Sequence, residues 1–173
     1  MSSPLICHIL IGPPGCGKST FAALLTKLDP RARIVSTDQI RRSLFGDESI
    51  QGDWAIIEEQ VLAQIREAIQ AGQPVIYDAT NAKKEWRLSL LKQVADISSI
   101  GCSPMVQWKG WYLQTPLEVC KVWNKQRNRQ VPELVIEELF RALQDNPPHT
   151  SEGFVAVNCV DLSKQEFDGQ HFP

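Results

Sequence analysis

The chain has 173 residues, a length that suits one domain and is too short for two that each bury a core. Apolar residues make up 43% and charged residues 22%, which excludes an intrinsically disordered or collagen-like chain. The 18 basic and 20 acidic residues give a net charge of -2, too balanced for a protein that coats nucleic acid nonspecifically. Any contact with nucleic acid must therefore come from a local basic patch.

The cysteine pattern and the first apolar segment indicate a compartment. The five cysteines are odd in number, widely spaced and never arranged as a CxxC pair, so neither a disulfide framework nor a thiolate zinc site is indicated. The apolar run at residues 5–11 is too short to span a membrane and lacks the basic residues that precede the apolar core of a signal peptide. We therefore expect a cytoplasmic protein without membrane contact.

In chain order, short apolar runs alternate with longer segments of helical periodicity. This alternation predicts βαβ units around a parallel sheet, an α/β fold with helices on both faces. The sequence Thr115-Pro116-Leu117-Glu118 fits a capping box, which places the Thr115 side chain at a helix start. We expect a domain at residues 1–162 and a polar tail at residues 163–173. The predicted strands are residues 5–11, 32–36, 74–77, 105–113 and 154–160, and predicted helices begin near residues 18, 52, 82, 116 and 132.

A glycine-rich loop lies between the first predicted strand and the first predicted helix. Its residues 12–19 match the pattern GxxxxGK[ST], and glycines allow its amides to approach a polyphosphate at the N-terminus of the helix. Lys18 can bridge the terminal phosphates, and the Ser19 hydroxyl can bind magnesium. The loop predicts binding of ATP or GTP with Mg²⁺; the alternative is a glycine turn without a ligand. The expected nucleotide-binding residues are Gly12, Pro13, Pro14, Gly15, Cys16, Gly17, Lys18, Ser19 and Thr20.

Cys16 lies inside this loop and has two interpretations. The helix N-terminus and Lys18 could lower the pKa of its thiol and make it reactive, or Cys16 could simply fill the loop as a small residue. We favour the second interpretation.

The residues after the second predicted strand suggest an acceptor for the phosphoryl group. Asp38 follows this strand, and Arg41 and Arg42 come three and four residues later, on one face of the next turn. A carboxylate here could accept a hydroxyl proton, while an arginine holds an anionic group of the acceptor. The alternative is an N-cap aspartate beside two solvated arginines. If the acceptor is an oligonucleotide, contacts through both arginines predict activity that weakens steeply with salt.

Two further segments carry candidate residues. The apolar run 75–77 ends in Asp78, the form of a strand whose terminal aspartate holds magnesium; alternatively, Asp78 caps the turn that leads to Thr80 and Asn81. Residues 121–130, which we call the lid segment, contain four basic residues and no acid. In this segment Arg127 and Arg129 could close over the nucleotide and neutralise the migrating phosphoryl group. The alternative is a solvated basic face.

The tryptophans divide into two groups. Trp108 and Trp111 belong to a predicted core strand, where packing explains them. Trp54 and Trp86 lie beside the acceptor motifs and could line a pocket for a base or another planar group, although packing is also the alternative for them.

Four motifs in chain order resemble a known family: GPPGCGKST, STDQIRRSLFGD, VIYDATN and NKQRNRQVP. Together, over residues 9–160, the chain resembles the P-loop predicted kinases related to the 5′-kinase domain of bacteriophage polynucleotide kinase. The resemblance implies a sheet order of 2-3-1-4-5 and a helical lid. It also implies that Asp38 is the general base, that Arg41 contacts the acceptor phosphate, and that Asn81 and Arg87 lie near the acceptor pocket. Arg87 fits equally well as a surface residue.

We therefore expect an ATP- and magnesium-dependent kinase that uses Lys18, Ser19, Asp38 and a lid arginine to move the γ-phosphoryl group to a hydroxyl. The resemblance favours a polynucleotide 5′-hydroxyl as acceptor. One alternative is a small-molecule kinase of the gluconate, antibiotic or sugar-nucleotide type, because the balanced charge suits a small acceptor. Another is a nucleotide-binding regulatory NTPase without an acceptor. The expected partners are a nucleotide and one of these acceptors, and the sequence does not indicate the oligomeric state.

Overall fold

The computed structural model describes residues 4–99 and 105–164. A five-stranded sheet forms its centre, and all neighbouring strands are parallel, in the order β2-β3-β1-β4-β5. This confirms the predicted fold class and strand order. The strands are β1 (Leu5–Ile11), β2 (Arg33–Ser36), β3 (Val75–Asp78), β4 (Val106–Leu113) and β5 (Ala156–Val160).

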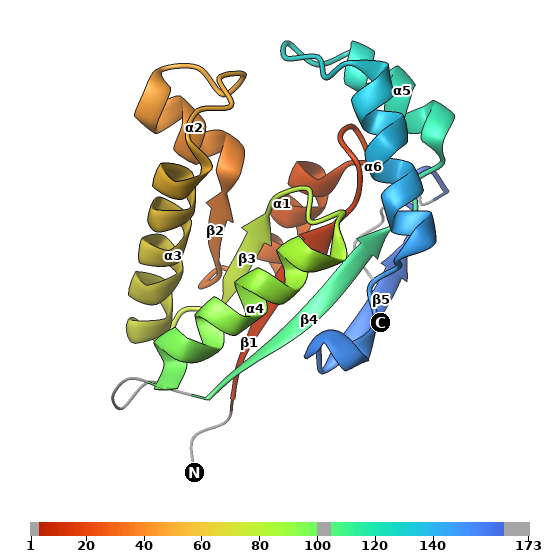
Figure 1. The fold of residues 1–173 in the computed structure, drawn as a ribbon. Coiled ribbons are helices and arrows are strands. Elements are labelled where there is room, and N and C mark those ends of the chain that lie inside the picture. Colours follow the sequence, from red (N-terminus) through yellow and green to blue (C-terminus); the bar gives the residue numbers. More distant parts are fainter. Residues whose placement is uncertain (1–3, 100–104, 165–173) are drawn as a thin grey trace.

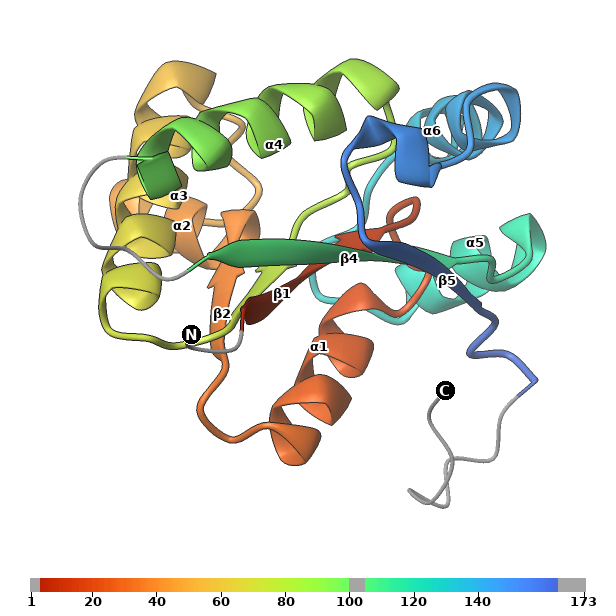
Figure 2. The same cartoon turned by 90° about the horizontal axis from the view of Figure 1, so that it is seen from below.

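Helices cover both faces of the sheet, and Figure 2 shows α1 on one side of it and α4 on the other. The core is therefore divided in two. Side chains of α2, α3 and α4 pack on one face, side chains of α1 and α5 pack on the other, and α6 contributes to both parts of the core. The helices are α1 (Lys18–Leu28), α2 (Thr37–Phe45), α3 (Trp54–Gln70), α4 (Lys84–Ser99), α5 (Leu117–Lys125) and α6 (Glu133–Asp145), with a short 3₁₀ helix, η1 (Thr150–Glu152).

The longest helix, α3, shows why the periodic segments fold as they do. Its buried residues recur every three or four positions, which places one apolar stripe against the sheet. The central strand β1 is instead an almost continuous apolar run, because a strand in the middle of a parallel sheet is covered on both faces. The buried stripe of α3 consists of Ile57, Val61, Ile65, Ala68 and Ile69.

The strand register gathers the candidate residues at one edge. Ser36 at the end of β2 pairs with Asp78 at the end of β3, and β1 ends at Ile11, directly before the glycine-rich loop. In open parallel sheets, ligands bind outside the carboxyl ends of the strands. Figure 1 shows α2 and α3 at one side of this edge and α5 and α6 at the other.

One local prediction was wrong. The Thr115 hydroxyl does not cap α5 but donates to the Cys16 carbonyl at 2.9 Å, and the N-cap of α5 is Pro116. Residues 165–173 of the predicted polar tail, with Phe167 and Phe172, lie outside the described residues. Within the described ranges, no helix is both long and apolar enough to cross a membrane.

Candidate active site

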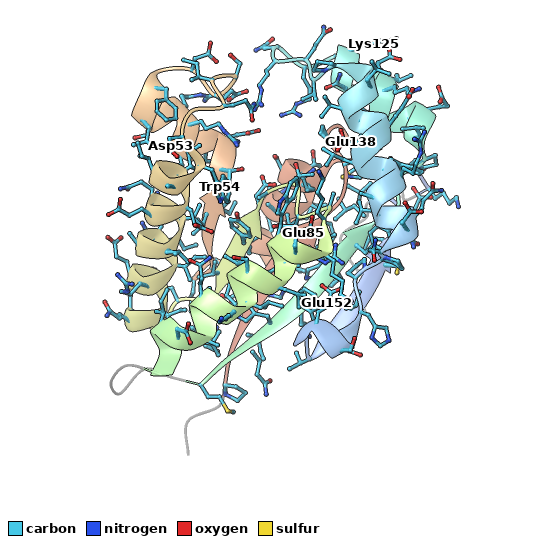
Figure 3. The ribbon with its side chains drawn as sticks, in the orientation of Figure 1. Asp53, Trp54, Glu85, Lys125, Glu138 and Glu152 are labelled. Atoms are coloured by element: carbon cyan, nitrogen blue, oxygen red, sulfur yellow. The ribbon has the colours of Figure 1, made fainter. Side chains whose placement is uncertain are left out.

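A cavity of about 1100 Å³ lies outside the carboxyl ends of the strands. Its lining includes the glycine-rich loop, the start of α2, the end of β3 and residues 126–131, which connect α5 to α6. Residues of α3, α4 and α6 complete the lining. In Figure 3 Trp54 on α3 and Glu138 on α6 lie on opposite sides of this region, and both line the cavity.

The glycine-rich loop folds around the ammonium group of Lys18. The Lys18 Nζ donates to the carbonyls of Gly12 at 3.0 Å and Pro13 at 2.8 Å. Gly15 and Gly17 have left-handed φ values of 80° and 97°. A Cβ would lie 2.3 Å from the Cys120 carbonyl oxygen at the first position and 2.5 Å from a Leu162 methyl carbon at the second. The loop therefore needs glycine at both positions, and its curved backbone before α1 fits a polyphosphate.

Ser19 and Asp78 meet beside this loop. The Ser19 Oγ donates to Asp78 Oδ2 at 2.8 Å, so among the described residues the hydroxyl, and not the turn at Thr80, is the partner of this carboxylate. Burial raises the pKa of Asp78, while Lys18 and the Ser19 hydroxyl oppose that shift. The described ranges hold no cluster of three or more histidine, cysteine or acidic side chains that could enclose a metal. Mg²⁺ needs no such cluster because it takes one or two carboxylates together with waters and phosphates, so this pair of oxygens fits it.

Three arginines converge on Asp38, in the first turn of α2. Arg129 Nη1 lies 2.8 Å from Asp38 Oδ1, Arg41 Nη1 lies 3.3 Å from the same oxygen, and Arg127 Nη2 lies 3.7 Å from Oδ2. Arg127 and Arg129 come from the lid segment, so this segment reaches across the cavity to α2. The arrangement concentrates positive charge beside the glycine-rich loop, where guanidinium groups can bind phosphate oxygens.

The two arginines after Asp38 have different surroundings. The Arg41 side chain is only 13% exposed and lines the cavity, and its buried Nε has no hydrogen-bond partner among the described residues. A buried donor without a partner is unfavourable and can be satisfied by a bound group. Arg42 is instead 67% exposed, pairs with Glu48 and is not part of the cavity lining. Arg42 thus lies outside the cavity that Asp38 and Arg41 line, and its expected contact with the substrate stays a prediction.

Arg87 lies neither at the surface nor in the cavity lining. It is completely buried, and its Nε and Nη2 donate to the two carboxylate oxygens of Glu152 at 2.7 and 2.8 Å. Its remaining donors bind the carbonyls of Asn81, Ala82 and Asn146. This contradicts the surface interpretation, and it places Arg87 behind the cavity lining, in contact with the backbone of Asn81.

Asn81 lines the cavity, but its amide group serves the backbone. Its Nδ2 donates to the carbonyls of Leu10 at 2.8 Å and Ala79 at 3.2 Å, and its φ of 49° is left-handed. Asn81 thus ties the segment after β3 to β1. The Thr80 carbonyl next to it accepts from the Gly12 amide at 3.1 Å, which connects this segment to the glycine-rich loop.

Cys16 is completely buried, and burial raises the pKa of its thiol. This agrees with a residue that fills the loop. The tryptophans also divide as expected: Trp108 and Trp111 are buried, whereas Trp54 and Trp86 line the cavity. The cavity contains further side chains that the sequence did not indicate, because no motif surrounds them. Among them are Glu58, Lys83 and Glu138.

Comparison with known proteins concerns both sequence and fold. No curated protein matches the sequence significantly. The Pnkp1/Rnl/Hen1 RNA repair complex has a similar fold, with 22% identity and a TM-score of 0.72, over 84% of this chain and 46% of that one. A fungal RNA kinase is 17% identical, with a TM-score of 0.66, over 98% of this chain and 80% of that one. A gluconokinase from Sinorhizobium meliloti is 16% identical, with a TM-score of 0.56, over 95% and 86%.

The protein thus spans less than half of the matched chain in the RNA repair complex. At these identities the likeness concerns the fold, which is that of P-loop kinases. The sequence match is more specific, because residues 7–146 fit the family model for an AAA domain. Since that match takes in the glycine-rich loop, Asp38, Asp78 and most of the sheet, the chain belongs to the AAA domain family.

Proposed function

We propose that this protein is an ATP- and magnesium-dependent kinase that transfers the γ-phosphoryl group to a hydroxyl, with a polynucleotide 5′-hydroxyl as the leading acceptor. One observation carries the proposal: the glycine-rich loop and the Asp38 carboxylate line the same cavity. Three guanidinium groups gather at that carboxylate, as the transfer of a highly charged group requires.

The donor side of the site would be built by the loop and α1. The amides at the start of α1 and the Lys18 ammonium would bind the phosphates of ATP. Ser19 and Asp78 would hold the Mg²⁺, which neutralises charge on the phosphates. Arg127 and Arg129 would turn from Asp38 toward the phosphate oxygens, because both reach the cavity from the lid segment.

Asp38 would serve as the general base. Its carboxylate accepts the proton of the acceptor hydroxyl while the hydroxyl oxygen forms a bond to the γ-phosphorus and the bond to the ADP oxygen breaks. A carboxylate has about four lone-pair sites, so Asp38 can accept this proton while Arg41 still holds one of its oxygens. Arg41 would keep the base oriented and use its unpartnered Nε for the acceptor.

The choice of acceptor rests on two kinds of support. The RNA kinases among the structural neighbours favour a polynucleotide end, by analogy of fold. A small-molecule acceptor is the second candidate, because Glu58 and Glu138 line the cavity together with the ammonium of Lys83, which pairs with Glu138. Such a wall does not repel an uncharged acceptor.

Incubation with γ-labelled ATP, Mg²⁺ and a panel of acceptors tests the proposal. The panel holds 5′-hydroxyl DNA and RNA, nucleosides and sugars, with a 5′-phosphorylated oligonucleotide as the matched control that has no free 5′ end. Label on a 5′-hydroxyl oligonucleotide but not on its phosphorylated control supports the leading acceptor, and label on a sugar alone supports the second candidate. Slow phosphate release without any labelled acceptor contradicts both and favours a regulatory NTPase.

A further inference from the structure

Two half-exposed indoles line the cavity. Trp54 is 49% exposed at the start of α3, and Trp86 is 44% exposed in the first turn of α4. Tryptophan is highly buried on average, so two such side chains in one cavity leave an unusual amount of aromatic surface free. Apolar side chains of Val61, Leu90 and Leu139 continue this surface between them and the sheet.

The charges around these indoles disfavour a polyanion. Lys83 forms an ion pair with Glu138 at 3.2 Å, and its ammonium lies 5.2 Å from the centre of the Trp86 ring. The positive charge of Lys83 is therefore balanced by Glu138 in the wall of the same cavity. The second carboxylate of this wall, Glu58, accepts from the Gln93 amide at 2.9 Å. Two carboxylates thus face one ammonium here, and a chain of phosphates finds no row of cations.

The volume of the cavity leaves room for two ligands. Small-molecule sites usually occupy about 300–1000 Å³. The cavity measures about 1100 Å³, and its lining includes both the glycine-rich loop and the two indoles. A nucleotide bound at the loop would leave the aromatic part to the acceptor.

We infer that Trp54 and Trp86 stack on an aromatic heterocycle carried by the acceptor. This inference rests on the proposed kinase function and narrows its substrate class. The protein recognises one nucleoside unit, either free or at the 5′ end of a strand, and the phosphate backbone beyond that unit adds little. Arg41 lines the cavity, and its unpartnered Nε would take the phosphate that follows the first nucleoside. The activity on an oligonucleotide should therefore depend only weakly on salt, whereas contacts through both Arg41 and Arg42 would make this dependence steep.

Alanine at either tryptophan should raise the KM for a 5′-hydroxyl thymidine decamer roughly 5- to 150-fold, the range for losing one stacking contact with a base. The KM for ATP should stay within about twofold, because the proposed ATP contacts come from the glycine-rich loop and α1 and not from these indoles. Trp54→Phe and Trp86→Phe should restore most of the loss, since phenylalanine still stacks. Leu28→Ala is the matched control, because Leu28 is an exposed apolar residue at the end of α1 and outside the cavity lining.

Changing the acceptor gives the second half of the test. A decamer whose first sugar lacks its base should lose about as much as the alanine variants do, and it should lose nothing more when assayed with those variants. Thymidine, its dinucleotide and the decamer should have KM values within about tenfold of one another. For the decamer, log KM should rise with the logarithm of the salt concentration with a slope of about one. Equal KM values for the intact and abasic decamers, or a steep salt slope, overturn the inference and leave the kinase proposal intact.

Binding separates the inference from the kinase proposal where no label is transferred. In that case the proposed function fails, and the quenching of tryptophan fluorescence by the thymidine decamer becomes the readout. Quenching by the intact decamer that is absent with the abasic one and in both alanine variants upholds the aromatic site. Binding that is unchanged by these substitutions overturns it.

Discussion

Replacing Arg87 by methionine should destabilise the fold by about 3–5 kcal/mol, the range for removing one partner of a buried ion pair. The side chains of Arg87 and Glu152 are 0% and 2% exposed, so the variant leaves a buried carboxylate without its cation and with the His149 amide as its remaining donor among the described residues. It also leaves the carbonyls of Asn81, Ala82 and Asn146 without their donor. A loss of this size is a large part of the roughly 5–15 kcal/mol by which domains are stable.

Chemical denaturation followed by tryptophan fluorescence measures this loss, and a thermal scan should show a midpoint lowered by roughly 6–20 °C. The double variant Arg87→Met with Glu152→Gln should be more stable than Arg87→Met alone, by roughly 0.5–3 kcal/mol, because it removes the uncompensated charge. Arg31→Met is the matched control. Arg31 pairs with Asp29 at the surface, where solvent screens the pair, so its denaturation midpoint should hardly move.

The opposite result would show that Arg87 acts on the acceptor. A folded Arg87→Met variant within about 1 kcal/mol of the parent, with a raised KM for the acceptor alone, would refute the argument from burial. The structural account also predicts weaker ATP binding in this variant, because the segment that Arg87 holds donates and accepts hydrogen bonds next to the glycine-rich loop. Two of these bonds are Gly12 N to Thr80 O and Asn81 Nδ2 to Leu10 O.

Three further predictions concern a buried histidine, the proposed magnesium ligand Asp78 and two cysteines. Burial, aided by Lys109, lowers the pKa of His8 from 6.5 to about 4, so between these pH values the unfolded chain binds the proton more strongly than the folded one. The unfolding free energy should therefore fall by about 1.4 kcal/mol for each unit by which the pH is lowered in this window. His8→Asn should weaken this pH dependence in denaturation curves. Asp78→Asn should raise the Mg²⁺ concentration for half-maximal activity about tenfold or more, measured by titrating the metal at fixed ATP, and an unchanged requirement would exclude Asp78 from the metal site. Peptide mapping after treatment with a thiol reagent should find exposed Cys159 labelled and buried Cys16 protected in the native protein; rapid labelling of Cys16 would mean that the loop opens.

Most of the fold could be predicted from the sequence because local patterns determine it. The apolar run of β1, the glycine-rich loop and the three- and four-residue spacing in α3 are all short-range signals, and the structure confirms them. The capping-box prediction failed for the opposite reason. The Thr115 hydroxyl binds the Cys16 carbonyl, 99 residues away in the chain, and spacing within a helix start cannot indicate such a partner.

The candidate site could likewise be predicted where local signals mark its residues, but not where long-range contacts place them. Lys18, Ser19, Asp38 and Asp78 could be found because each lies at the end of a strand or in the loop or helix start that comes after it, and parallel strands bring those ends to one edge. Arg87 could not be placed, because its partner Glu152 lies 65 residues further along the chain, and an arginine looks the same in a sequence whether it is solvated or buried.

The acidic side chains that complete the cavity lining could not be placed from the sequence either. Glu58 and Glu138 lie on helices whose sequence pattern predicts only an apolar face and a polar face. That their carboxylates line the cavity depends on how α3 and α6 are arranged around the sheet, as Figure 1 shows for the two helices.

The most direct measurement of the central claim is phosphoryl transfer by Asp38→Asn. With γ-labelled ATP and a 5′-hydroxyl oligonucleotide, turnover should fall by about two or more orders of magnitude, while calorimetry finds ATP affinity within a few-fold of the parent. Glu59→Gln, which removes an exposed carboxylate from α3, should change neither quantity. Turnover by Asp38→Asn that matches the parent would contradict the claim that this carboxylate receives the proton of the acceptor hydroxyl.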